Sequence, residues 1–420
     1  MTTAELPQQT SVPARPAPRS RLRARYREVA HMNPRLKSPK AYFNWARANW
    51  ELMTGASEVK ARPLKITFDP TNVCQLRCPL CPTGLEVQDR EKGHAGLPMF
   101  QKLLDELGGH LFFIDFFNWG EPLLNTHIED FISLASKRNI VSRMSTNLSL
   151  PLTDERIERI VSSGIGEIIV SLDGASGDTY GLYRRQGNFD LVVNNMRRLI
   201  LAKHRLGLQQ PLITWQFLVF GFNEHEIPKA QALADEIGVE KLIFLPPFLD
   251  EGRFPMKESD KALVATWKPK DPLYQIENAP GNDDKPKSRC GWHYMSAAVN
   301  WDGTVASCCT TFTKEDDFGS VGRRGESSFM GVFNNEAFRS VRERFAGRRK
   351  QPVSLVCEKC PTPAIMGYHN YLNRQVALYT AVSLVEWVRR PFRRAPRPQL
   401  SQQKSASEAN RKWQNASAGH

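Results

Sequence analysis

Between residues 64 and 245, short apolar runs typical of buried strands alternate with longer segments of helical periodicity. The runs predict strands at 64–68, 111–117, 140–144, 167–172, 212–220 and 241–245, and the intervening segments predict helices at 98–108, 126–138, 153–163, 189–206 and 224–237. A repeated strand–helix–strand order implies a parallel sheet with right-handed crossovers. The predicted fold class is therefore α/β, and functional side chains are expected where the strands end.

Two of the predicted helices are preceded by residues that can cap them. Thr153 comes before the third helix and Asn223 before the fifth. Glu226 follows Asn223 by three residues, which is the spacing of a capping box. We therefore expect Asn223 and Glu226 to satisfy the free backbone N–H groups at the start of the fifth helix.

The rest of the chain divides by composition. Residues 1–38 are rich in Pro, Ala and Arg, which is typical of disorder, and 366–388 has a long helical pattern. The predicted domains are a basic disordered leader with a short helix at 1–60, a barrel at 61–249, a charged linker at 250–289, a cysteine-bearing domain at 290–365 and an amphipathic helix with a basic tail at 366–420.

The formal net charge of +13 is concentrated at the two ends of the chain. Residues 1–40 hold nine basic and two acidic residues, and 387–420 hold eight and one, so each end contributes +7 and the body is near neutral. A neutral body argues against nucleic-acid binding by the folded part. Without a long apolar run or a secretory signal pattern, a cytoplasmic location is expected. The aromatic residues and arginines at 366–394 also allow a peripheral contact with an anionic membrane surface.

A triad of cysteines directly after the first predicted strand is the sharpest sequence feature. Cys74, Cys78 and Cys81 have the spacing CxxxCxxC within one loop. Soft thiolate ligands favour an iron–sulfur cluster or zinc. Three thiolates leave one metal corner without a protein ligand, and chemistry at a metal requires such an open position. The alternative is a zinc knuckle with His94 as its fourth ligand, although this spacing is not a common zinc pattern.

The triad resembles the cluster-binding motif of radical S-adenosylmethionine enzymes, and the resemblance extends over residues 62–248. It implies a partial (β/α)6 TIM-like barrel that holds a 4Fe–4S cluster and S-adenosyl-L-methionine. It also implies an electron donor of the flavodoxin or ferredoxin type. In such enzymes one electron cleaves the sulfonium to give a 5′-deoxyadenosyl radical, which abstracts hydrogen from the substrate. The protein supplies orientation and excludes side reactions.

A second motif follows the second predicted strand. Gly120, Glu121 and Pro122 resemble the family's Gly-Glu-Pro motif, which holds the methionine amino group of the cofactor. Trp119 stands where the family usually has another Gly, so the motif is kept in part. A carboxylate at Glu121 can pair with an ammonium group, and Gly120 would let the ligand approach the backbone.

Polar residues also end the third and fourth predicted strands. Asn147 follows one of these strands, and Ser171 and Asp173 lie at the end of the other. In similar proteins such residues contact the ribose and the methionine carboxylate. Arg184 resembles the arginine that binds this carboxylate. Taken singly, a polar residue at a strand end is more often a turn or cap residue, so the argument depends on their order along the strands. No catalytic acid or base is predicted.

Five further cysteines lie in the last third of the chain. A predicted hairpin with its turn at 302–303 would bring Cys290 near Cys308. The region resembles the SPASM and twitch extensions that carry auxiliary 4Fe–4S clusters, and the cysteine count is closer to the smaller twitch form. Zinc is the rival occupant, and Cys309 could replace Cys308 as a ligand. The predicted metal ligands of this set are Cys290, Cys308, Cys357 and Cys360.

Three functions are compatible with this pattern. The first is a radical enzyme that oxidises or epimerises a small molecule or glycan. The second is a radical maturase that modifies a ribosomal peptide. The third, of another class, is a non-catalytic scaffold held together by metal. Formation of 5′-deoxyadenosine would exclude the third.

Overall fold

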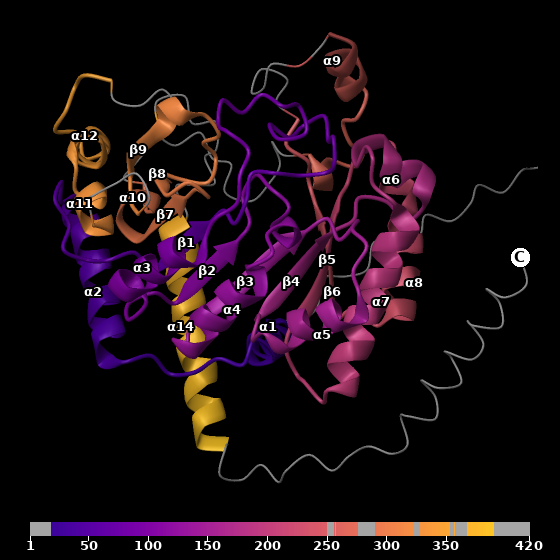
Figure 1. The fold of residues 1–420 in the computed structure, drawn as a ribbon, viewed down its shortest axis with the longest axis horizontal. Helices are drawn as coiled ribbons and strands as arrows, with labels where there is room; N and C mark the ends of the chain where they lie inside the picture. Colours follow the sequence, from indigo (N-terminus) through magenta and orange to yellow (C-terminus); the bar gives the residue numbers. More distant parts are fainter. Residues whose placement is uncertain are drawn as a thin grey trace, which may run out of the picture.

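The computed structural model describes residues 18–249, 256, 258–275, 290–322, 328–352, 357 and 368–389. One sheet of nine strands organises the described chain, in the order β6-β5-β4-β3-β2-β1-β7-β8-β9 (Figure 1). The strands are β1 Lys65–Phe68, β2 Phe113–Phe116, β3 Val141–Thr146, β4 Glu167–Ser171, β5 Leu212–Leu218, β6 Lys241–Leu245, β7 Ser296–Val299, β8 Thr304–Ala306 and β9 Asp317–Ser320. The α/β class predicted from the sequence is confirmed.

Strands β1 to β6 are parallel and are linked by helices, as the alternation predicted. These helices are α3 Leu97–Leu107, α4 Ile128–Lys137, α5 Asp154–Ser162, α6 Gly177–Tyr183, α7 Phe189–Arg205 and α8 Ile227–Ile237, with short 3-10 turns η1 Pro122–Leu124 and η2 Glu224–Glu226. Helix α6 was not predicted. Thr153 caps α5 as predicted, because its side chain accepts a hydrogen bond from the backbone N–H of Arg156.

Aromatic side chains bind the first helices to the sheet. Phe68 of β1 and Phe116 of β2 are fully buried against Phe100 of α3 and Phe131 of α4. Their ring centroids lie between 4.8 and 6.4 Å apart, mostly in tilted or edge-to-face pairs. Phe68 and Phe116 are the last residues of these paired parallel strands, so the loops that follow both strands begin at the same rim of the sheet.

The C-terminal region continues the same sheet. β7 pairs in parallel with β1, and β8 and β9 then add antiparallel strands. The hairpin predicted at 302–303 is confirmed, with Gly303 at φ +86° in its turn. Around it lie α10 Trp292–Met295, η5 Lys314–Asp316, α11 Phe329–Phe333 and α12 Glu336–Phe345.

The segment expected to be a disordered leader contains a helix. Residues 1–17 lie outside the described chain, but α1 Pro18–His31 precedes α2 Pro39–Thr54, and α1 packs on α14 Tyr368–Arg389. Tyr26 donates to Glu386 at 2.7 Å, so the two helices pair across 360 residues. Periodicity in a short stretch of sequence cannot reveal that α14 packs against α1. For this reason disorder was predicted where the structure has a helix.

Helices α1, α2 and α14 lie at the end of the barrel where the strands begin. Lys241, the first residue of β6, pairs with Glu28 at 2.8 Å, and Lys37 donates to the carbonyl of Asn139 before β3 at 3.0 Å. Tyr379 of α14 packs on Phe113 of β2, with ring centroids 5.8 Å apart. The rim that carries the predicted site residues is the opposite one. No helix within the described residues is both long and apolar enough to cross a membrane.

Part of the predicted linker is also folded. Residues 250–255, 257 and 276–289 lie outside the described chain, but α9 Glu258–Ala265 and η3 Pro272–Tyr274 lie within it. Trp267 is buried against Phe220 and Tyr183, with ring centroids 5.5 and 6.1 Å away. The segment therefore packs on the barrel and is not a free connection.

The predicted capping box is wrong. The side chain of Asn223 accepts from the N–H of Phe220 and donates to the carbonyl of Asp173, and it makes no cap bond to the following helix. Glu226 accepts from the backbone of Ala175 at 2.7 Å and from Ser176 at 2.6 Å. Both residues instead hold the loop that connects β4 to α6, because that loop offers buried donors that the sequence spacing does not reveal.

Candidate functional site

The cysteine triad lies in the loop that leaves β1 at the rim of the sheet. The N–H of Cys81 bonds to the carbonyl of Cys78 at 3.2 Å, which makes a tight turn. A Cβ atom at Gly84 would lie 2.4 Å from the Cys78 carbonyl oxygen, so the loop folds back on itself at a position that excludes other side chains.

Glu121 connects the Gly-Glu-Pro motif to the end of β3. It is 2% exposed, and its carboxylate accepts from the Thr146 hydroxyl at 2.6 Å and from the backbone N–H of Asn147 at 2.8 Å. Burial raises the pKa of this carboxyl, and the donated hydrogen bonds counteract the shift. A carboxylate oxygen accepts two hydrogen bonds. The oxygen facing Asn147 thus has room for one more donor such as an ammonium group.

Asn147 carries this connection to the triad. Its amide nitrogen donates to the Sγ of Cys74 at 3.7 Å, while its amide oxygen accepts from Gln75 at 2.8 Å. A donor directed at a sulfur ligand stabilises a negatively charged thiolate and tunes a bound cluster. The structure therefore brings the predicted residues Glu121, Asn147 and Cys74 into one chain of contacts.

A second chain of contacts reaches Cys78 from the end of β4. Asp173 is fully buried and accepts from the Nε of Arg184 at 2.6 Å and from the N–H of Leu218 at 2.7 Å. The Nη1 of Arg184 lies 3.9 Å from the Sγ of Cys78. The guanidinium also stacks over Tyr183, 5.1 Å from the ring centroid. Asp173 thus fixes an arginine whose remaining donors face the triad and can also meet a carboxylate.

The other predicted cofactor residues occupy the same rim. Gly120 lies so close to Thr71 that a Cβ would fall 1.7 Å from its carbonyl oxygen, so glycine is needed there for backbone packing. Pro122 is buried and begins η1. Ser171 is buried, with its hydroxyl 3.4 Å from that of Ser145. Their predicted roles in cofactor binding stay predictions.

An apolar wall encloses the triad on the side of α9. Cys78 belongs to a buried cluster with Leu76, Tyr183 and Phe220, and Cys74 and Cys81 pack against it. Val264 and Trp267, from the predicted linker, complete the cluster. The wall buries Cys78 and partly covers Cys74 and Cys81, so it limits the access of water to this side of the triad.

The thiols fit an iron–sulfur cluster by their chemistry. Burial raises the pKa of Cys74 to about 12 and that of Cys78 to about 11, so the uncoordinated side chains are protonated at neutral pH. Coordination deprotonates a thiol, and the Asn147 and Arg184 donors then face the resulting thiolates. Among the described residues, no three Cys, His, Asp or Glu side chains are grouped closely enough to hold a single metal ion.

The described cysteines of the second set lie next to α10 or in the segment after β8. Cys357 is buried, and its Sγ lies 3.9 Å from the hydroxyl of Ser307 and 3.7 Å from the Nε2 of His293. Cys308 is buried one residue after Ser307, and Cys290 immediately precedes the turn into α10. Cys360 lies outside the described residues. Burial raises the pKa of the spare thiol, Cys309, to about 12.

His293, which the sequence did not single out, lies beside the predicted ligand Cys357. It follows Cys290 by three residues, a spacing that could have drawn attention to it. It is 3% exposed, and burial lowers its pKa to about 3, so the ring is neutral and can act as an acceptor or a ligand. Arg342 holds it in place by donating to its carbonyl oxygen at 2.8 Å.

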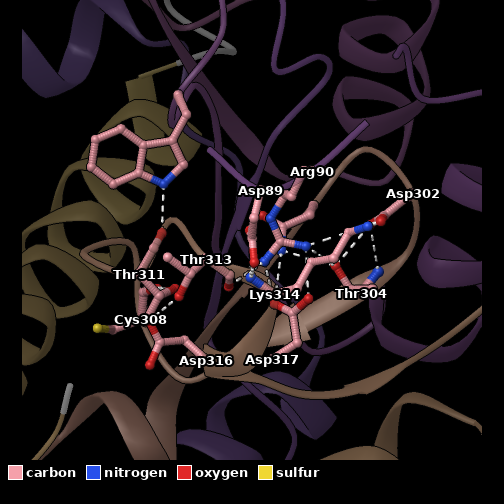
Figure 2. Close-up of polar contacts among 12 residues, drawn as sticks. Asp89, Arg90, Asp302, Thr304, Cys308, Thr311, Thr313, Lys314, Asp316 and Asp317 are labelled. Carbon is pink, nitrogen blue, oxygen red and sulfur yellow. Dashed lines mark hydrogen bonds and ion pairs between the residues drawn. The ribbon is translucent and has the colours of Figure 1, made fainter. Parts of the chain in front are cut away.

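Figure 2 shows how the loop after the triad is fixed to the C-terminal region. Arg90 is 7% exposed and makes a two-pronged contact with Asp317 of β9, at 2.5 and 2.7 Å. It also donates to the Thr304 hydroxyl and to the Thr313 carbonyl, both at 2.9 Å. Next to it, Asp89 accepts from the backbone N–H of Lys314 at 2.8 Å.

These features define the class of protein. Residues 68–230 match the model of the radical SAM superfamily, and residues 290–361 match the SPASM iron–sulfur cluster-binding domain. The chain is a radical SAM enzyme with a C-terminal SPASM domain. Its cofactors are S-adenosylmethionine, the iron–sulfur cluster that binds S-adenosylmethionine, and auxiliary iron–sulfur clusters in the SPASM domain. The iron–sulfur prediction at the second cysteine set is thus confirmed over zinc.

Individual relatives are similar over part of the chain. Mycofactocin maturase MftC of Mycobacterium tuberculosis (strain CDC 1551 / Oshkosh) is 25% identical over 140 residues, 33% of this chain and 35% of the relative. PqqA peptide cyclase of Bradyrhizobium diazoefficiens is 24% identical over 192 residues, 46% of this chain and 48% of the relative. The chain thus spans between a third and a half of the length of these curated relatives.

A solved structure supports the fold. The crystal structure of Streptococcus suis SuiB bound to S-adenosylmethionine matches with a TM-score of 0.50 and 12% identity. The match covers 76% of this chain and 75% of SuiB. At this identity the likeness concerns the arrangement of the elements only.

Proposed function

We propose that this enzyme uses S-adenosylmethionine-derived radical chemistry to modify a peptide substrate. The observation that carries the radical step is the convergence of the Glu121 and Arg184 contact chains on two cysteines of the triad. Cys74, Cys78 and Cys81 would hold the cluster, which would supply the electron for reductive cleavage of bound S-adenosylmethionine and so the means to abstract hydrogen from the substrate. Glu121 would orient the methionine ammonium, and Arg184 would orient its carboxylate.

The peptide substrate is supported by the relatives. A mycofactocin maturase and a PqqA peptide cyclase share the matched regions, and peptide modification fits them better than the small-molecule or glycan reading. The apolar wall around the triad would exclude water while a substrate segment enters from the open side of the rim. An electron donor of the flavodoxin or ferredoxin type would reduce the cluster.

Deuterium transfer distinguishes the substrate classes. A perdeuterated extract of cells that produce the protein is separated into a peptide fraction and a nucleotide-sugar and metabolite fraction. Each is incubated with the reconstituted enzyme, S-adenosylmethionine and reductant. We expect singly deuterated 5′-deoxyadenosine, measured by mass spectrometry, from the peptide fraction. Label from the metabolite fraction alone would favour the small-molecule or glycan reading. Label from neither would count against the peptide assignment, and no 5′-deoxyadenosine at all would count against the radical step.

We also propose that the end of α14 contacts an anionic membrane surface. Trp387 is 62% exposed and Val388 56%, and Leu384 and Val385 beside them are exposed as well. Arg389 follows at once, and the neighbouring helix α1 presents arginines to solvent. An exposed apolar helix end flanked by basic residues is suited to the boundary between lipid headgroups and acyl chains.

Vesicle sedimentation tests the membrane contact. The protein is expected to sediment with vesicles that contain phosphatidylserine at low salt, and the double variant Trp387→Glu/Val388→Glu is expected to stay in the supernatant. Trp50→Glu, at an equally exposed tryptophan on α2, is the matched control and should still sediment. Absence of sedimentation by the unmodified protein would refute the contact, as would sedimentation of the double variant.

A further inference from the structure

Trp119 makes a contact that the family motif does not explain. It stands in the loop after β2, at the place where the sequence departs from the usual glycine. Its indole Nε1 donates to the carbonyl oxygen of Thr311 at 2.6 Å, and its ring meets Phe312 edge-on, with centroids 6.1 Å apart. Figure 2 shows the indole directed at Thr311, on the segment that carries Cys308. A glycine could make neither contact.

The contact continues to the auxiliary cysteines. The hydroxyl of Thr311 donates to the carbonyl oxygen of Cys308 at 2.9 Å. With its amide oxygen and nitrogen exchanged, Asn118 would donate to the carbonyl oxygen of Cys309 at 3.1 Å, and its oxygen would share the indole N–H of Trp119 with Thr311, at 3.1 Å. Residues 118 and 119 therefore contact the backbone at Cys309 and at Thr311, directly after Cys308.

The same loop ends at the predicted cofactor residue. Glu121 lies two residues after Trp119, and its backbone N–H bonds to the carbonyl of Val73 at 2.8 Å, next to Cys74. A Cβ atom at the intervening Gly120 would fall 1.7 Å from the carbonyl oxygen of Thr71, so the backbone of this loop is packed closely against Thr71. Only this residue separates Glu121 from Trp119, so a displacement at Glu121 is expected to reach Trp119.

We propose that Trp119 is a positioning residue that couples binding of S-adenosylmethionine at Glu121 to the surroundings of the auxiliary iron–sulfur cluster. The inference rests on the proposed function, since it requires both clusters and the cofactor. Hydrogen bonds and backbone dipoles near cysteine ligands set the reduction potential of a cluster. Because coupling between two sites is reciprocal, the cofactor changes the auxiliary potential, and the oxidation state of the auxiliary cluster changes cofactor affinity.

Potentiometry followed by electron paramagnetic resonance tests the coupling in the reconstituted enzyme without substrate. In the unmodified protein, S-adenosylmethionine is expected to shift the potential of the auxiliary cluster. Trp119→Phe keeps an aromatic ring against Phe312 but removes the N–H donor, and the shift is expected to be lost. Trp45→Phe is the matched control, because the half-buried indole of Trp45 donates to Asn373 at the same distance of 2.6 Å, on α2.

Each outcome is decisive. Retention of the shift in Trp119→Phe would overturn the coupling, as would its absence in the unmodified protein. In the latter case, continued formation of 5′-deoxyadenosine would show that the proposed radical function still stands. Loss of auxiliary iron from Trp119→Phe alone would reduce Trp119 to a folding role and would also overturn the proposal. Asn118→Ala, which removes the amide that contacts both Cys309 and Trp119 but keeps the bond from Trp119 to Thr311, should diminish the shift and leave the iron content unchanged.

Discussion

Replacing Cys74, Cys78 and Cys81 together with alanine is expected to remove about four of about eight irons per chain and to abolish 5′-deoxyadenosine formation. The three thiols are the soft ligands at the rim where the Glu121 and Arg184 contact chains meet. Without them no cluster can deliver the electron that cleaves S-adenosylmethionine. Iron and sulfide are measured after anaerobic reconstitution, and 5′-deoxyadenosine by chromatography. Iron that stays near its original value would remove the triad as the cluster site.

Two single variants serve as controls for the triad variant and also show whether Cys308 or Cys309 binds the auxiliary cluster. Cys308→Ala is expected to lose the auxiliary iron, whereas Cys309→Ala is expected to keep both clusters, since Cys309 is taken as the spare thiol. The opposite pattern would make Cys309 the ligand in place of its neighbour. Neither variant alters the triad, so both should retain its iron.

Arg90→Met is expected to destabilise the protein by about 3–5 kcal/mol, because it leaves the partly buried Asp317 carboxylate without its ion-pair partner. The change also takes donors from Thr304 and from the Thr313 carbonyl. The denaturant midpoint of the reconstituted enzyme is the measurement. Lys92→Met is the matched control in the same loop. Its ion pair with Glu86 is exposed, so little change is expected.

A second variant separates the ion pair from the shape of the side chains. If burial of an unpaired charge is the cause, Arg90→Met/Asp317→Leu should lose less stability than the sum of the two single changes. Additive losses of stability would show that Arg90 and Asp317 contribute independently, without a stabilising interaction between their charges. Equal midpoints for Arg90→Met and Lys92→Met would contradict the buried pair altogether.

The barrel could be predicted from the sequence because each of its elements is built from local apolar periodicity. Phe68 and Phe116 lie in apolar runs that predict strands. Both pack on Phe131 of α4, in keeping with the predicted order in which helices cover a parallel sheet. The triad could be found for a similar reason, since CxxxCxxC lies within one short loop. The strand-end residues Glu121, Asn147 and Asp173 were proposed from their order along the strands and from the family resemblance.

The features that the sequence did not predict depend on partners far along the chain. Helix α1 is held by α14, and Trp119 meets Thr311 across 192 residues. Asn223 and Glu226 have the spacing of a capping box, but buried donors near Ala175 and Ser176 recruit Glu226 instead. A short stretch of sequence does not show which donors from distant residues lie near a side chain. Which hydrogen bonds Glu226 makes is therefore known only from the folded structure.

Strand β1 is bonded along both edges, to β2 on one side and to β7 on the other. The barrel was predicted to end at residue 249, but the hydrogen bonds of its sheet continue into β7, beyond that residue. A fragment that ended there would leave the β7-facing edge of β1 as a row of unpaired N–H and C=O groups. Such edges join strands of other chains. A barrel expressed alone would therefore be expected to self-associate through β1, so the two cluster-binding regions should be produced and purified as one polypeptide.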